Sequence, residues 1–139
     1  MRSDNCAAVA PEIIESLSAA NDGSALAYGG DEITERLEGQ VRKIFEHDGA
    51  RIFPITSGTG GNALGLSSLT PPWGAVVCHP TAHIVSNEPG STSLFAGGAQ
   101  MLHVGGDDYL IDVDQLRSTL ELFPWRDPHN SQPSVFSFT

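Results

Sequence analysis

The sequence has little positive charge, and this scarcity excludes several kinds of partner. Of its 139 residues only seven are Lys or Arg, against 17 Asp or Glu, which gives a formal net charge of −10. Such an excess of negative charge repels nucleic acid and anionic lipid, so we expect neither nucleic acid nor membrane as a partner. No apolar run approaches the roughly 18 residues needed to cross a bilayer. The segment 1–11 also has no apolar core of the kind found in secretory signals.

Cysteine is also scarce, because Cys6 and Cys78 are the only two in the chain. Two distant cysteines without a secretory signal are typical of reduced thiols, so we expect a cytoplasmic protein. Cys78 ends a short apolar run, and its simplest interpretation is a small apolar residue in a buried strand.

Helical and strand-like segments alternate along the chain and indicate an α/β fold. Apolar residues recur at helical spacing in segments that begin near Pro11 and Asp31, and in the segments 63–69 and 112–122. Strands are predicted for the short apolar runs at 51–56, 75–78, 100–104 and 134–138. This alternation predicts crossover connections in an incomplete three-layer arrangement with a mostly parallel sheet. Because a parallel strand normally leads into a helix and the chain ends at the fourth run, we expect 1–139 to be a single partial domain.

A glycine-rich turn follows the first predicted strand. Ser57-Gly58-Thr59-Gly60-Gly61-Asn62 combines two hydroxyl side chains with glycines, which allow a phosphate to approach the backbone. Unpaired N–H groups at the start of the following helix would favour that phosphate. A tight turn without a ligand is an alternative. A dinucleotide fingerprint is another, although the acidic residue that it needs about 20 positions later is absent.

A second polar segment, His79-Pro80-Thr81-Ala82-His83, follows the next predicted strand. Ligands of open α/β sheets bind at the carboxyl ends of strands, so we expect this segment at the same edge as the glycine turn. A histidine there can stack on a flat ring or move protons near neutral pH. A structural histidine is the simpler interpretation. A zinc site is a further alternative, but Pro80 interrupts the helix that would place His79 and His83 on one face.

Five segments in register resemble the threonine aldolase and β-eliminating lyase family, which has the aspartate-aminotransferase fold type. In chain order these segments are Arg2-Ser3-Asp4-Asn5, Tyr28-Gly29-Gly30-Asp31, Ser57-Gly58-Thr59 with Asn62, Ala82-His83 with Glu88 and Gly90, and Gln132-Pro133-Ser134-Val135. The resemblance implies part of the large domain of a transferase-like enzyme that depends on pyridoxal 5'-phosphate. The segment 69–74 is most similar to the low-specificity members. Pro80-Thr81 and Asn87 depart from the family pattern and leave the substrate open.

The resemblance also implies a role for individual residues. Ser57-Gly58-Thr59 would hold the cofactor phosphate, and His83 would cover the pyridine ring and assist proton transfer. Ser3 would contact the substrate carboxylate, and Tyr28 would lie near the active site of its own or a neighbouring subunit. No residue is assigned to a metal.

The implied reaction cleaves L-threonine and related β-hydroxy-α-amino acids into glycine and an aldehyde, in a homo-oligomer that is a dimer or a tetramer. The cofactor acts as an electron sink for the carbanion that cleavage leaves. The alternatives are a relative that performs β-elimination or amino transfer, and a non-catalytic remnant that binds phosphate or cofactor.

The family also needs a lysine that forms an imine with the cofactor and an acid against the pyridine nitrogen, and we expect both after the fourth strand. Lys43 is the only lysine of this chain and lies beside Arg42 on the charged face of a predicted helix. We therefore expect the chain alone to be inactive and to lack a covalent anchor for the cofactor.

This expectation gives a first testable prediction. After the chain is mixed with pyridoxal phosphate, borohydride reduction and peptide mapping should show no stoichiometric label on Lys43, because a solvated lysine has no pocket to hold the imine. Stoichiometric labelling confined to Lys43, together with turnover, would contradict it.

Overall fold

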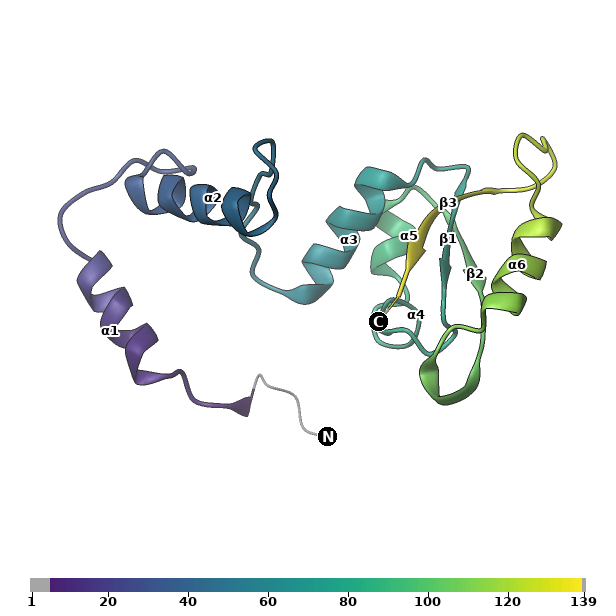
Figure 1. Cartoon of the computed structure of the whole chain (residues 1–139), viewed down its shortest axis with the longest axis horizontal. Coiled ribbons are helices and arrows are strands. Elements are labelled where there is room, and N and C mark those ends of the chain that lie inside the picture. Colours follow the sequence, from purple (N-terminus) through teal and green to yellow (C-terminus); the bar gives the residue numbers. More distant parts are fainter. Residues whose placement is uncertain (1–5, 139) are drawn as a thin grey trace. The chain divides into compact units, whose positions relative to one another are not determined.

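The computed structural model describes residues 6–138, in which two compact units are found, Met1–Phe53 and Pro54–Thr139. The first unit contains two helices, α1 (Pro11–Ala20) and α2 (Glu32–Ile44) (Figure 1). Asp31 caps α2, because its carboxylate accepts hydrogen bonds from the Thr34 hydroxyl at 2.7 Å and the Thr34 N–H at 2.8 Å. These two bonds hold the pKa of Asp31 below its ordinary value. Both helices begin where their capping signals predict.

One face of α2 is charged, as the sequence predicts. The Glu38 carboxylate accepts from Arg42 Nη2 at 2.7 Å and from Arg51 Nε at 3.1 Å. Lys43 is exposed on this helix. Its interpretation as a solvated surface lysine is therefore confirmed.

The second unit is built on a parallel sheet of three strands in the order β2-β1-β3. The strands are β1 (Gly74–Cys78), β2 (Gln100–His103) and β3 (Gln132–Ser137). The helices are α3 (Gly58–Leu69), α4 (His83–Ser86), α5 (Ser91–Phe95), the 3-10 turn η2 (Asp107–Tyr109) and α6 (Val113–Leu122). Among residues 6–138, no helix is both long enough and apolar enough to span a membrane.

Strand β1 is the centre of this unit, because all five of its residues are buried. Alternate side chains point to opposite faces of a strand. On one face Val76 and Cys78 pack with residues of α3 and α4. On the other face Ala75 and Val77 pack with β2 and with residues in and next to α6. Figure 1 shows α3, α4 and α5 on one side of the sheet and α6 on the other, so the unit has the three layers that the sequence predicts.

Cys78 shows how completely β1 is enclosed. It is 0% exposed, and this burial raises the pKa of its thiol to about 11. Its interpretation as a small apolar residue in a buried strand is confirmed.

The prediction of four strands is wrong for its first member. The run 51–56 forms no strand in the structure. Pro54 within it has no N–H to donate to a neighbouring strand. The run is not buried either, since Phe53 is 78% exposed and Ile55 is 46% exposed.

Helix α3 also begins earlier than the apolar pattern predicts. It starts at Gly58, so the glycines of the expected turn form its first helical turn. The reason is the cap, since the Ser57 hydroxyl oxygen accepts from Gly60 N at 3.2 Å. Thr59 accordingly lies at the start of a helix, as predicted.

The dependence on β1 gives a second prediction. Val76→Ala should lower the free energy of unfolding by about 2–3 kcal/mol, because it removes two buried carbon atoms and leaves a cavity. Val76 is 0% exposed and touches the core on one face of the sheet. The midpoint and slope of urea unfolding provide the measurement.

The matched control is Val113→Ala, because Val113 is 65% exposed in the same unit. We expect it to change stability by less than about 0.5 kcal/mol. Equal effects of the two changes would contradict the central position of β1.

Candidate functional site

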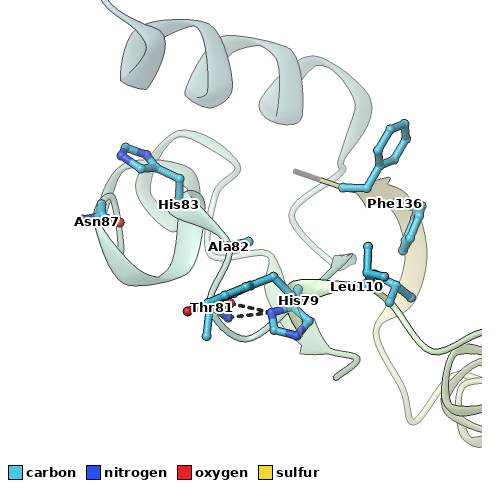
Figure 2. Close-up of a pocket in the computed structure, with 10 residues that line it drawn as sticks. His79, Thr81, Ala82, His83, Asn87, Leu110 and Phe136 are labelled. Atoms are coloured by element: carbon cyan, nitrogen blue, oxygen red, sulfur yellow. Dashed lines mark hydrogen bonds between the residues drawn. The ribbon is translucent and has the colours of Figure 1, made fainter. Parts of the chain in front are cut away.

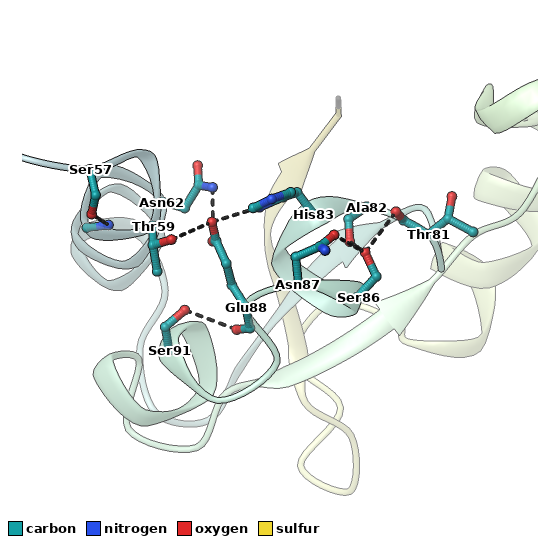
Figure 3. A network of polar contacts seen from close by, with 11 residues as sticks. Ser57, Thr59, Asn62, Thr81, Ala82, His83, Ser86, Asn87, Glu88 and Ser91 are labelled. Atoms are coloured by element: carbon teal, nitrogen blue, oxygen red, sulfur yellow. Dashed lines mark hydrogen bonds and ion pairs between the residues drawn. The ribbon is translucent and has the colours of Figure 1, made fainter. Parts of the chain in front are cut away.

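The polar segments singled out from the sequence meet where β1 ends. His79 follows Cys78 directly, and α4 begins four residues later at His83. The amino end of α3 lies beside this segment (Figure 3). The predicted grouping of His83 with the Ser57-Gly58-Thr59 segment at one edge of the sheet is therefore found in the structure.

The amino end of α3 presents unpaired hydrogen-bond donors. The first N–H groups of a helix have no partner within it, and here these belong to Gly58 and Thr59. Ser57 accepts from Gly60 N, so its own hydroxyl proton is available to another group. A Cβ built on Gly58 would meet no atom within 4 Å. This end of the helix is open to an incoming anion.

The carboxylate of Glu88 joins α3 to His83. Its Oε1 atom lies 2.7 Å from His83 Nδ1 and 2.9 Å from the Thr59 hydroxyl oxygen. Its Oε2 atom accepts from Asn62 Nδ2 at 3.1 Å. Figure 3 shows the three partners converging on this one side chain. Because only 3% of the Glu88 side chain is exposed, these contacts replace the water that the carboxylate has lost.

The hydrogen bonds decide the charge of Glu88. Burial raises its pKa, but the bonds from Asn62, Thr59 and His83 outweigh burial and hold the pKa below its ordinary value. Glu88 is therefore an ionised acceptor at neutral pH.

A cavity of about 470 Å³ opens beside the two histidines (Figure 2). Its wall combines the segment after β1 with residues near η2 and at the end of β3. The lining residues are His79, Thr81, Ala82, His83, Asn87, Tyr109, Leu110, Ile111, Phe136 and Phe138. The mixture of aromatic and aliphatic walls with a few polar groups suits a flat organic molecule.

His79 carries an unsatisfied polar atom in this wall. Its Nδ1 accepts from the Thr81 N–H at 3.2 Å and lies 2.6 Å from the Thr81 hydroxyl oxygen. The neutral ring then carries its proton on Nε2. That atom is buried and has no hydrogen-bond partner within residues 6–138. His79 also lies against the Tyr109 ring, with 6.2 Å between centroids.

Two expected site residues, Ser3 and Tyr28, belong to no part of the second unit that the structure describes. Ser3 lies outside the described residues. Tyr28 belongs to the first unit, has a fully exposed side chain and adopts a positive φ of 61°. Their roles remain predictions. In the part of the chain that the structure describes, no three His, Cys, Asp or Glu side chains gather to hold a metal.

Glu88 and Asn62 lie in segments that resemble the family, but the sequence predicted no role in the cofactor site for either residue. Asn62 is three positions after Thr59 on the same helix, a spacing that places both side chains on one face. Glu88 is one of three buried polar or charged residues among residues 6–138. A signal was available in the Thr59–Asn62 spacing, but its acceptor is 29 and 26 residues away along the chain.

Comparisons with known proteins found relatives that match nearly the whole chain. A family model described as beta-eliminating lyase matches residues 1–137. A low specificity L-threonine aldolase from a Pseudomonas species is 32% identical over 137 residues, which cover 99% of this chain and 39% of that protein. Another from Pseudomonas aeruginosa is 35% identical over 100 residues, which cover 72% of this chain and 29% of that protein. The chain therefore spans about two fifths of the length of the first of these relatives.

A solved structure has the same fold. A threonine aldolase of Leishmania major superposes with a TM-score of 0.83 at 22% identity, over 94% of this chain and 37% of that one. The expected α/β class, as part of a transferase-like fold, is confirmed by this match and by the parallel sheet.

The Glu88 cluster gives a third prediction. Folding lowers the pKa of such a carboxylate, so its ionised form stabilises the folded state at any pH above the pKa of the unfolded state. This stabilisation is lost as the pH falls through the lower pKa of the folded state. Glu88→Gln should lower the free energy of unfolding at pH 7 by roughly 1–3 kcal/mol, because buried partners lose a charged acceptor. The difference from wild type should shrink below the ordinary glutamate pKa of 4.5.

Urea unfolding measured from pH 3 to pH 8 provides the test. Glu121→Gln is the control, since it removes the same charge from an exposed position on α6. A Glu88→Gln defect that is equally large at pH 3 and pH 7 would contradict this prediction.

Proposed function

The chain belongs to the beta-eliminating lyase family, and from this premise we propose that it forms part of an aldehyde-lyase dependent on pyridoxal 5'-phosphate. The proposed reaction cleaves L-threonine and related β-hydroxy-α-amino acids to glycine and an aldehyde. The observation that carries the proposal is the Glu88 link, which places His83 beside the open amino end of α3. Two relatives, which are 32% and 35% identical to this chain, are low specificity L-threonine aldolases.

The residues present fit the phosphate of this cofactor. The unpaired N–H groups of Gly58 and Thr59 and the hydroxyl of Ser57 supply donors around one open position. The dipole of α3 adds positive potential at the same place. The Thr59 hydroxyl contacts Glu88, so Thr59 would hold the phosphate through its main-chain N–H.

The ring of the cofactor would lie against His83. The side chain of His83 is 56% exposed, and the residue lines the 470 Å³ cavity. When bound, pyridoxal phosphate supplies the electron sink that stabilises a carbanion at the substrate Cα. His83 would stack on the ring and accept or return a proton at Nε2, the ring nitrogen that does not face Glu88.

We propose in addition that the functional assembly is a cytoplasmic homo-oligomer acting on a small amino acid in glycine metabolism. The support for association is that α1 exposes an apolar stripe of Ile13, Ile14 and Leu17, which are 54%, 49% and 61% exposed. Such a stripe is normally covered by another surface. Tyr28 would approach the site of a neighbouring subunit in this assembly.

The phosphate site gives a fourth prediction. Gly58→Ala should weaken non-covalent binding of pyridoxal phosphate roughly tenfold, because the added methyl group hinders contact between the phosphate and the first N–H groups of α3. The dissociation constant is measured by quenching of intrinsic fluorescence. Inorganic phosphate should compete, since it would occupy the same donors.

Gly65→Ala is the matched control, because Gly65 lies in the same helix and its added Cβ would also meet no atom within 4 Å. This control should bind like wild type. No saturable binding to wild type, or equal affinities of the two variants, would refute the proposed cofactor site.

A further inference from the structure

Hydrogen bonds hold Glu88 at both its main chain and its side chain. Its backbone N–H donates to the His83 carbonyl oxygen at 3.0 Å. Its own carbonyl oxygen accepts from the Ser91 N–H at 3.1 Å and from the Ser91 hydroxyl at 3.0 Å. A residue held in this way between α4 and α5 has little freedom to turn its carboxylate elsewhere.

The side-chain partners also restrict the orientation of the carboxylate. Thr59 and Asn62 lie on one face of α3 and approach different oxygens of Glu88, Oε1 and Oε2. His83 Nδ1 reaches Oε1 at 2.7 Å, which is the shortest of the three contacts. These contacts fix the plane of the Glu88 carboxylate. They therefore also fix the direction from which the carboxylate holds the imidazole ring of His83.

The protons of this cluster can be assigned from its chemistry. An ionised carboxylate can only accept hydrogen bonds. Glu88 is held in that form, because the bonds it accepts outweigh its burial. His83 Nδ1 must then be the donor, and in a neutral ring Nε2 has a lone pair and no proton. Nε2 is the ring nitrogen left to face a ligand, and the His83 side chain as a whole is 56% exposed.

We infer that Glu88 is a positioning residue, which holds His83 as the Nδ1–H tautomer so that Nε2 accepts a proton from a bound substrate. This inference rests on the proposed function for the identity of that substrate, a β-hydroxy-α-amino acid whose hydroxyl proton leaves during cleavage. The hydroxyl proton would move to Nε2 as the Cα–Cβ bond breaks, and the cofactor, when bound, would supply the electron sink for the electron pair of that bond. Glu88 takes no proton and stabilises the positive charge that forms on the ring.

A purely structural role for Glu88 would join α3 to α4 without selecting a tautomer. The two roles differ in a spectroscopic signature, because protonated and unprotonated imidazole nitrogens have separate ¹⁵N chemical shifts. The chain is labelled with ¹⁵N-histidine, and the His83 signals are assigned by their loss in His83→Gln. Nitrogen–proton correlation spectra are recorded without cofactor at a pH where the ring is neutral.

In wild type, we expect Nδ1 to show the shift of a protonated nitrogen and Nε2 that of an unprotonated one. In Glu88→Gln the amide can donate as well as accept, so we expect the Nδ1–H preference to fall and the Nε2–H form to become populated. Glu88→Asp keeps the carboxylate and should retain more of the wild-type tautomer than Gln does. Glu121→Gln should leave both signals unchanged.

An Nε2–H tautomer in wild type would overturn the inference even if no variant folds. An unchanged Nδ1–H tautomer in folded Glu88→Gln would overturn it as well. These spectra need no cofactor or turnover, so they are independent of the binding test with Gly58→Ala. Loss of cofactor binding with the expected tautomer would refute the proposed function alone.

Discussion

The burial of β1 is the constraint on which the rest of the second unit depends. A strand that is enclosed on both faces and flanked on both edges can emerge from the sheet only at its ends. The polar segment that follows Cys78 must therefore reach solvent at the carboxyl edge. His79 and His83 lie at that edge, in the position where open α/β sheets bind ligands. The location of the site thus follows from hydrophobic burial, before any property of the histidines is considered.

The buried charge of Glu88 has a less obvious origin. Removing a carboxylate from water is unfavourable, and an ionic cluster of this kind is often no more stable than well-packed apolar residues of similar volume. Stability alone is therefore a weak reason to have Glu88 in this place. A carboxylate does what an apolar residue cannot, because it accepts a proton-bearing nitrogen in a defined direction. That argument favours orientation of His83 as the reason for the charge.

The local features of the structure could be predicted from the sequence, whereas the contacts between distant segments could not. Caps at Asp31 and Asp112 start helices where the pattern of residues predicts them, because a cap depends on neighbours in the chain. The run 51–56 was wrongly predicted as a strand, since pairing requires a partner strand that the local sequence does not reveal. The sequence also did not predict that Thr59 and Asn62 share the Glu88 carboxylate as their acceptor. This carboxylate is brought to α3 by the folding of α4 and α5, which no local spacing reveals.

The same cluster connects the two ends of the proposed cofactor site. The Thr59 hydroxyl contacts Glu88, which leaves only main-chain donors and Ser57 for the phosphate. Binding of the phosphate in the proposed site then depends more on the position of α3 than on the side chains that α3 carries. Glu88 fixes that position relative to His83 by contacting both. A ligand that bridged the start of α3 and the imidazole ring would meet both groups already in place, and preorganisation of this kind reduces the entropy lost on binding. A buried carboxylate that is unfavourable in isolation becomes useful because it holds two binding groups at one fixed separation.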